Sequence, residues 1–162
     1  MRLFFALWPP PDTAQALAGW AGGMQGRATA AEKIHLTLAF LGETDPQPAI
    51  DAAKAVKAAP FDLPLEVPKY WRHNRIVWVG PRQTPPKLQA LVHSLHGELE
   101  RRGFRLEDRP FAAHVTLLRH AAPPESLPEL PVLAWPAREF VLVRSVDGAY
   151  ERLAGFPLAV AA

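Results

Sequence analysis

The sequence contains no cysteine among its 162 residues. Disulfide bonds, thiolate zinc sites, iron–sulfur clusters and cysteine nucleophiles are therefore excluded. A long hydrophobic run is also missing, because no window approaches the ~18 continuous apolar residues of a membrane-spanning helix. The apolar stretch at residues 3–8 ends in three prolines and is shorter than the core of a secretion signal, which needs roughly 7–15 residues. We therefore expect a soluble, cytoplasmic protein with no membrane partner.

The sequence also lacks a large excess of charge of one sign. Lys and Arg number 18 and Asp and Glu number 16, so the formal net charge is +2 and does not by itself predict a broad polyanion-binding surface. Hydrophobic residues make up 49% and charged residues 21%, values that are typical of a globular domain. The length fits one domain, or two small lobes that share a core, over residues 1–162, and we expect a monomer with no protein partner implied.

Hydrophobic periodicity and turn residues predict alternating short strands and helices. Helices are expected from Asp12 to Met24, from a cap at Asp45 to about Ala59, and from a cap at Thr84 to a stop at Gly103. Strands are expected at residues 3–8, 34–40, 61–67, 75–79, 111–119, 138–146 and 156–160, with a turn at 147–148 and a proline-rich loop over 121–136.

One short pattern, His-aliphatic-Thr-Leu, occurs twice on predicted strands, beginning at His35 and at His114. Side chains two positions apart on a strand point to the same face. His35 and Thr37 should therefore project together, as should His114 and Thr116, while the aliphatic residues between them enter the core. The two copies are separated by nearly half of the chain, which indicates an internal duplication with two facing lobes.

A single histidine on a strand is more often a packed or surface residue than a catalytic one. Two matched copies favour function, because a polar pair among aliphatic residues costs free energy unless each polar group has a partner. A cleft between two such lobes would hold two imidazoles on opposite sides and two hydroxyl groups between them. A phosphate group fits that arrangement.

The chain resembles the two-histidine phosphoesterase superfamily and, within it, the RNA 2′,3′-cyclic phosphodiesterases, historically called 2′-5′ RNA ligases. The resemblance covers essentially the whole chain and is carried by RLFFA at 2–6, HLTLAFLGE at 35–43, WVG at 78–80 and HVTLLR at 114–119. Ala113 stands where the family usually has proline. The resemblance implies an α+β fold of two pseudo-symmetric lobes, each a mostly antiparallel sheet with helices on its outer face, and an active-site cleft between them.

The same resemblance implies a hydrolase that converts 2′,3′-cyclic phosphate ends of RNA to 2′-phosphates without metal or cofactor, with a reversible 2′-5′ ligase activity. It implies that His35 donates a proton, that His114 accepts one, and that Thr37 and Thr116 complete the catalytic set by holding the phosphate. It also suggests two substrate contacts, Phe5 and Arg119. Histidine chemistry agrees independently, because an unperturbed pKa of ~6.5 lets one imidazole be charged and another neutral near pH 7.

Three alternatives remain open from the residues alone. His35 and His114 could be ligands in a metal-dependent hydrolase, although Thr37 and Thr116 stand where such a site needs carboxylates. The chain could be a non-catalytic RNA-binding module, although binding alone does not require a matched acid and base. The substrate could also be another small cyclic or 2′-5′-linked nucleotide rather than RNA.

Overall fold

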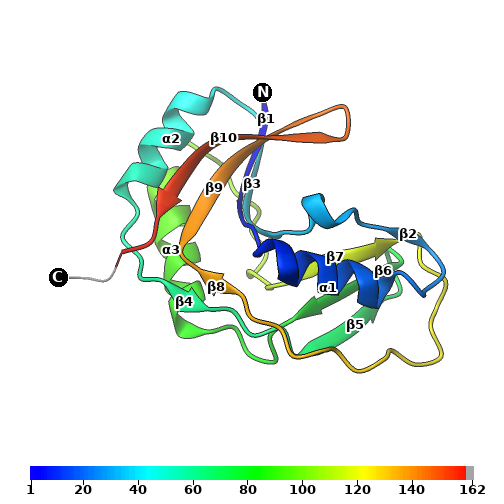
Figure 1. Cartoon of the computed structure of the whole chain (residues 1–162). Coiled ribbons are helices and arrows are strands. Elements are labelled where there is room, and N and C mark those ends of the chain that lie inside the picture. The colour runs from blue at the N-terminus through cyan, green and yellow to red at the C-terminus, as the bar shows by residue number, and fades with distance from the viewer. Residues whose placement is uncertain (160–162) are drawn as a thin grey trace.

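The computed structural model of the chain describes residues 1–159 and contains two four-stranded sheets and one small two-stranded sheet (Figure 1). The first sheet has the order β10-β9-β1-β3, with the bounds Ala149–Pro157, Glu139–Val146, Arg2–Leu7 and Leu36–Glu43. The second has the order β2-β7-β6-β5, with the bounds Arg27–Ala28, Val115–Arg119, Ile76–Gly80 and Val67–Trp71. The small sheet pairs β4, Phe61–Asp62, with β8, Pro136–Ala137. All these pairings are antiparallel.

Three α-helices and one short 3₁₀ helix accompany the sheets, with the bounds α1 Pro11–Ala21, η1 Ala31–Lys33, α2 Pro46–Ala55 and α3 Pro86–Arg101. We call the first sheet with α2 and α3 the first lobe, and the second sheet with α1 the second lobe. The α+β fold of two antiparallel lobes expected from the sequence is confirmed. Within the part of the chain that the structure describes, no helix has the length and apolar character needed to cross a bilayer.

The two faces of the first sheet have different neighbours. On β1, Leu3, Phe5 and Leu7 belong to the main core, which also contains the apolar stripe of α3. Phe4 and Ala6 point the other way and form a smaller cluster with residues of β9. The helices therefore cover one face of this sheet, and the opposite face is free to form part of a site between the lobes.

Two of the expected helix signals can be compared with the structure. The side chain of Asp45 accepts a hydrogen bond from the backbone N–H of Gln47 at 3.0 Å, so the predicted cap of α2 is confirmed. The predicted cap of α3 at Thr84 is wrong, because the cap position is Pro85 and no side chain caps that end. The proline at the first helical position, Pro86, has no N–H to satisfy, so the helix begins there without a side-chain acceptor.

The strand expectations differ from the structure at several places, and β2 was not expected at all. Only the first two residues of the expected strand at 61–67 pair in a sheet, and β5 starts at Val67 instead. β7 starts at Val115 rather than at residue 111. β10 starts at Ala149, directly after the turn at Asp147 and Gly148, whose φ values of 51° and 79° close a tight hairpin. The expected end of the last strand, Val160, lies outside the described residues.

We predict that Leu91→Ala in α3 lowers the free energy of unfolding by roughly 2–5 kcal/mol, because the Leu91 side chain is fully buried in the main core. The matched control is Gln89→Ala on the exposed side of the same helix, which should change it by less than about 0.5 kcal/mol. Urea unfolding followed by circular dichroism measures both values. Equal effects of the two substitutions would contradict the assignment of this helix face to the core.

Candidate active site

The two histidines of the repeated motif occupy equivalent places, each one residue before a strand begins. His35 precedes β3 and His114 precedes β7. In both copies the histidine and the threonine two positions later are half-buried, and the aliphatic residues between and after them are buried. The strand alternation predicted from the sequence is therefore confirmed. β3 and β7 also contact each other across the boundary between the lobes.

Each imidazole is oriented by a hydrogen bond to its own backbone two residues earlier. The Nδ1 atom of His35 lies 2.6 Å from the carbonyl oxygen of Lys33, and the Nδ1 atom of His114 lies 2.9 Å from the carbonyl oxygen of Ala112. A carbonyl oxygen only accepts hydrogen bonds, so Nδ1 carries the proton in both rings. In both histidines Nε2 is then left to accept a proton when the ring is neutral and to donate one when it is charged.

Both motifs line one cavity of about 520 Å³ between the lobes. His35 and Thr37 come from the first lobe, and His114 and Thr116 come from the second. Other polar side chains complete the lining, namely Arg27, Thr29, Lys33, Arg119, Ser145 and Tyr150. Three of these side chains are cationic, and within residues 1–159 no carboxylate lines this cavity. The cavity therefore attracts an anion.

Aromatic rings surround the histidines, and sequence reasoning did not assign them to the site. Trp8 stacks on His35 with ring centroids 4.7 Å apart and an interplanar angle of 13°, and Tyr150 meets the same imidazole edge-on at 5.4 Å. Trp71 and Trp78 contact His114 at 4.9 and 6.1 Å. Trp78 is the cross-strand neighbour of Thr116, so its place depends on strand pairing and not on spacing along the chain.

The end of β6 approaches the second motif so closely that a side chain would not fit. A Cβ atom added at Gly80 would lie 2.6 Å from the carbonyl oxygen of Ala113. Such a separation is well below van der Waals contact, so any other residue here would push β6 away from the segment that carries His114. The glycine of the WVG motif therefore has a direct part in positioning this histidine.

Burial lowers the pKa of His35 below the ordinary histidine value of 6.5. The main cause is desolvation, which disfavours the charged imidazole, and the positive charges of Arg119 and His114 act in the same direction. The hydrogen bond to the Lys33 carbonyl opposes the shift. His35 is therefore mostly neutral at pH 7 when the cavity holds no anion.

Of the two expected substrate contacts, the structure places one in the cavity and not the other. Arg119 lines the cavity from the end of β7. Phe5 does not, because its side chain is fully buried in the main core and packs against Phe140 and Phe156. The assignment of Phe5 as a substrate contact is therefore wrong. Phe4, on the opposite face of β1, lies 5.1 Å from the His35 ring.

Over residues 1–159, no group of three or more histidine, aspartate or glutamate side chains is arranged to hold a metal ion. The groups that accompany each histidine in the cavity are hydroxyl groups and cations.

The sequence matches the family described as the 2′-5′ RNA ligase superfamily over residues 9–148. It is 36% identical over 134 residues to a protein of Escherichia coli named RNA 2′,3′-cyclic phosphodiesterase, a match that covers 78% of this chain and 76% of that protein. A protein of the same name from Thermus thermophilus is 32% identical over 171 residues, covering 90% of this chain and 82% of the relative.

Solved structures show the same fold over nearly the whole chain. The crystal structure of E. coli LigT in apo form has a TM-score of 0.89 and 32% sequence identity and covers 98% of both chains. A structure described as E. coli LigT complexed with 3′-AMP has a TM-score of 0.87 and 32% identity, with 97% of both chains covered.

We predict that the imidazole of His35 titrates with a midpoint below 6.5, because desolvation disfavours its charged form. The unfolded chain then binds more protons than the folded protein just below pH 6.5, so folding stability falls as the pH drops through this range. NMR titration of the imidazole signals, with His35→Gln to assign the peak, measures the midpoint. A midpoint at or above 6.5 would contradict the prediction.

Nitrogen chemical shifts should also show the Nδ1–H tautomer for His35 and His114.

Proposed function

Because the chain belongs to the 2′-5′ RNA ligase superfamily, we propose that it is an enzyme of the RNA 2′,3′-cyclic phosphodiesterase type. In this proposal it hydrolyses 2′,3′-cyclic phosphate ends of RNA to 2′-phosphates by acid–base catalysis with two histidines and without a metal. The observation that carries the proposal is the pair of backbone-anchored imidazoles, His35 and His114, in one cationic cavity. The names of the relatives support the substrate class.

Binding of the cyclic phosphate rests on the groups between the histidines. The hydroxyl groups of Thr37 and Thr116 donate hydrogen bonds to the non-bridging oxygens, and Arg119 pairs with their negative charge. Donors that are held in place before the reaction stabilise charge that grows on these oxygens in the transition state. The half-buried position of the threonines keeps them aimed at the cavity.

The chemical step needs a base on one side of the phosphorus atom and an acid on the other. Nε2 of neutral His114 takes a proton from the attacking water, whose oxygen forms the new bond to phosphorus. The bond from phosphorus to the 3′ oxygen breaks, and Nε2 of charged His35 gives its proton to that oxygen. The product is a 2′-phosphate with a free 3′ hydroxyl group. To return to the starting state, His114 releases its extra proton to solvent and His35 takes up a proton from solvent.

Substrate binding supplies the condition for His35 to act as the acid. Burial and nearby cations keep this imidazole mostly neutral in the free protein. An anionic phosphodiester beside it offsets both effects and raises its pKa. Protonation of His35 is thus coupled to occupation of the cavity, so the charged, proton-donating form of His35 is populated mainly when substrate is bound.

When a 5′ hydroxyl group replaces water as the nucleophile, the same displacement breaks the bond from phosphorus to the 3′ oxygen and forms a 2′-5′ linkage. By microscopic reversibility the same two histidines also cleave that linkage. This ligase activity, the monomeric state and the cytoplasmic location stay predictions. So does the expectation that no cofactor takes part.

We predict that the purified protein converts an oligonucleotide with a 2′,3′-cyclic phosphate end to the 2′-phosphate in excess EDTA. His35→Ala and His114→Ala should each lower kcat by about 10²–10⁴-fold, because each removes one proton-transfer group. The matched control is His93→Ala on the exposed side of α3, which should leave kcat unchanged. Phosphorus NMR identifies the product and measures the rates.

Other outcomes of this assay separate the alternatives. Activity that is absent in EDTA and restored by a divalent metal would make His35 and His114 metal ligands and would overturn the proposed mechanism. Binding of the oligonucleotide without conversion under either condition would favour a non-catalytic module. Conversion of a small cyclic nucleotide but not of RNA would show that the substrate is a small nucleotide and not RNA.

We also predict that Thr37→Val and Thr116→Val each lower kcat by ~10²-fold, because valine keeps the shape of threonine and removes the donor to the phosphate oxygens. The control is Thr84→Val, in the loop before α3, where the side chain makes no helix cap. Steady-state kinetics and thermal unfolding of all three variants test this. Full activity of both site variants would show that the hydroxyl groups do not stabilise the transition state.

A further inference from the structure

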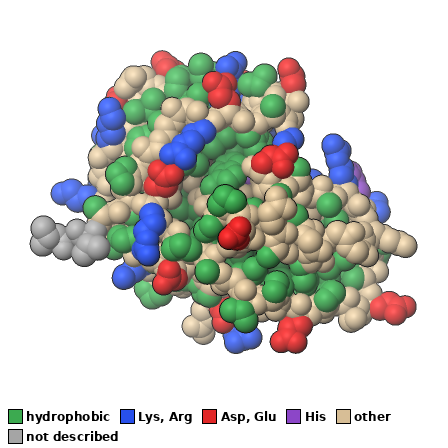
Figure 2. Space-filling view, in the orientation of Figure 1, with side chains coloured by type: hydrophobic (Ala, Val, Ile, Leu, Met, Phe, Trp, Pro, Cys, Tyr) green, Lys and Arg blue, Asp and Glu red, His purple; other side chains and the backbone are tan. Residues whose placement is uncertain are grey.

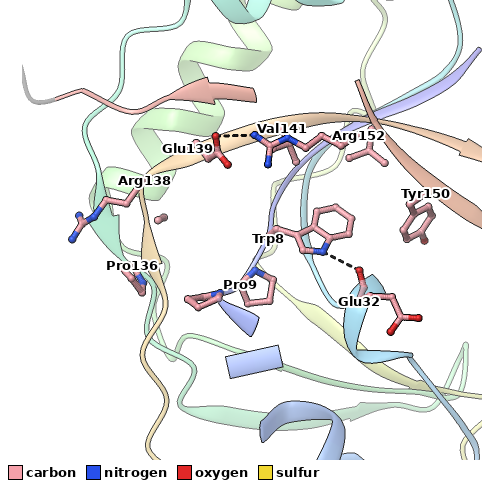
Figure 3. Close-up of a pocket in the computed structure, with 12 residues that line it drawn as sticks. Trp8, Pro9, Glu32, Pro136, Arg138, Glu139, Val141, Tyr150 and Arg152 are labelled. Atoms are coloured by element: carbon pink, nitrogen blue, oxygen red, sulfur yellow. Dashed lines mark hydrogen bonds and ion pairs between the residues drawn. The ribbon is translucent and has the colours of Figure 1, made fainter. Parts of the chain in front are cut away.

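A second cavity, of about 530 Å³, adjoins the histidine site on the side of the first sheet that faces away from α2 and α3 (Figure 3). Tyr150 lines both cavities and so forms part of the boundary between them. Val141 and Val143 of β9 contribute an apolar wall, and two prolines also line the cavity, with Pro9 at the bottom and Pro136 at the left in Figure 3. Figure 2 shows that hydrophobic side chains gather in the recess between the lobes, with acidic and basic side chains around it.

Trp8 lines the second cavity but not the cavity of the histidines. One face of its indole ring is stacked on His35 at 4.7 Å, and the ring lines only the second cavity. Its Nε1–H donates a hydrogen bond of 3.1 Å to the backbone carbonyl of Glu32, which fixes the ring in this orientation (Figure 3). The second cavity thus has a fixed aromatic surface directly behind the catalytic imidazole. A planar ring is the ligand that such a surface stacks best.

The polar groups of the second cavity are mixed, unlike those of the histidine site. Arg152 forms an ion pair of 3.0 Å with Glu139, and Arg138 lies at the rim and forms no ion pair among the described residues. Glu32 adds another carboxylate. A nucleobase carries both hydrogen-bond donors and acceptors on its edge, and the linkage attached to it carries a negative charge. The combination of an aromatic surface, carboxylates, an ion-paired arginine and one arginine at the rim therefore fits a nucleotide better than a bare phosphate.

We propose that the second cavity binds the nucleotide that precedes the terminal one, so that the enzyme acts on RNA chains in preference to mononucleotides. This inference rests on the proposed function of the histidine site. The terminal ribose must reach Nε2 of His35, and the indole ring of Trp8 separates the second cavity from that imidazole. The base on the outer face of Trp8 therefore belongs to the preceding nucleotide, and the strand leaves past Arg138.

The first test compares three substrates that end in the same 2′,3′-cyclic phosphate: a mononucleotide, a dinucleotide, and a dinucleotide whose first residue lacks its base. We expect kcat/KM to be higher for the intact dinucleotide than for the abasic one by roughly 5- to 150-fold, which is the value of one base stacked on an aromatic ring. Equal kcat/KM for the intact and abasic dinucleotides would overturn the inference.

The second test uses Arg138→Glu, which reverses a charge at the rim of the second cavity. The matched control is Lys87→Glu, which makes the same change of charge on α3, on the far side of the first sheet. Arg138→Glu should lower kcat/KM for the dinucleotide and reduce the slope of log(kcat/KM) against log[salt] by about 0.7, as expected for one lost contact to a single strand. Turnover of the mononucleotide should stay unchanged, and Lys87→Glu should leave both substrates unaffected.

Failure of the inference and failure of the proposed function have different signatures. An equal loss with mononucleotide and dinucleotide in Arg138→Glu, or the same loss in Lys87→Glu, would overturn the inference while turnover itself upheld the proposed function. If no substrate turned over, the proposed function would fail. Equilibrium binding of the intact and abasic dinucleotides, followed by quenching of tryptophan fluorescence, would then decide the inference, with equal affinities counting against it.

Discussion

The hydrogen bond from each histidine Nδ1 to the carbonyl two residues earlier is the contact on which the rest of the site depends. It fixes the tautomer, and it leaves Nε2 of His35 and of His114 as the ring atoms to which the proposed mechanism assigns proton transfer. Because each anchor is local backbone, the orientation of the ring needs no second side chain. The strand that follows then places Thr37 or Thr116 beside the ring by simple alternation. In the proposed mechanism, a segment of four residues thus supplies both a proton-transfer group and a phosphate-binding group.

The two motifs face each other because both are anchored in one core. Leu36 and Leu38, which flank Thr37, and Val115 and Leu117, which flank Thr116, belong to the same buried cluster. The chain also passes between the lobes several times, since β1 and β3 of the first sheet are separated by α1 and β2 of the second lobe. A shift of one lobe would therefore disturb packing throughout this cluster, which resists such movement. The distance between the imidazoles is set by core packing and not by a flexible linker.

The features predicted correctly from the sequence are those with a local cause. Strand alternation around His35 and His114 and the cap at Asp45 each follow from a few adjacent residues. The failures concern partners that are distant in sequence. Alternation on β1 requires that one of two adjacent phenylalanines face the core, but only the position of the helices decides that it is Phe5. The aromatic surroundings of the histidines, such as Trp8, depend in the same way on packing between distant segments.

The pseudo-symmetry of the motifs ends at their surroundings, and this difference has a chemical consequence. His35 is enclosed by Trp8, Tyr150 and Phe4, and its burial lowers its pKa. His114 has the same backbone anchor but lies against Trp71 and another tryptophan of the second lobe. A division into one acid and one base requires two imidazoles that respond differently to a bound anion. The equal anchors and unequal surroundings of His35 and His114 are consistent with the proposed division, while Trp8 also gives the neighbouring cavity its aromatic surface.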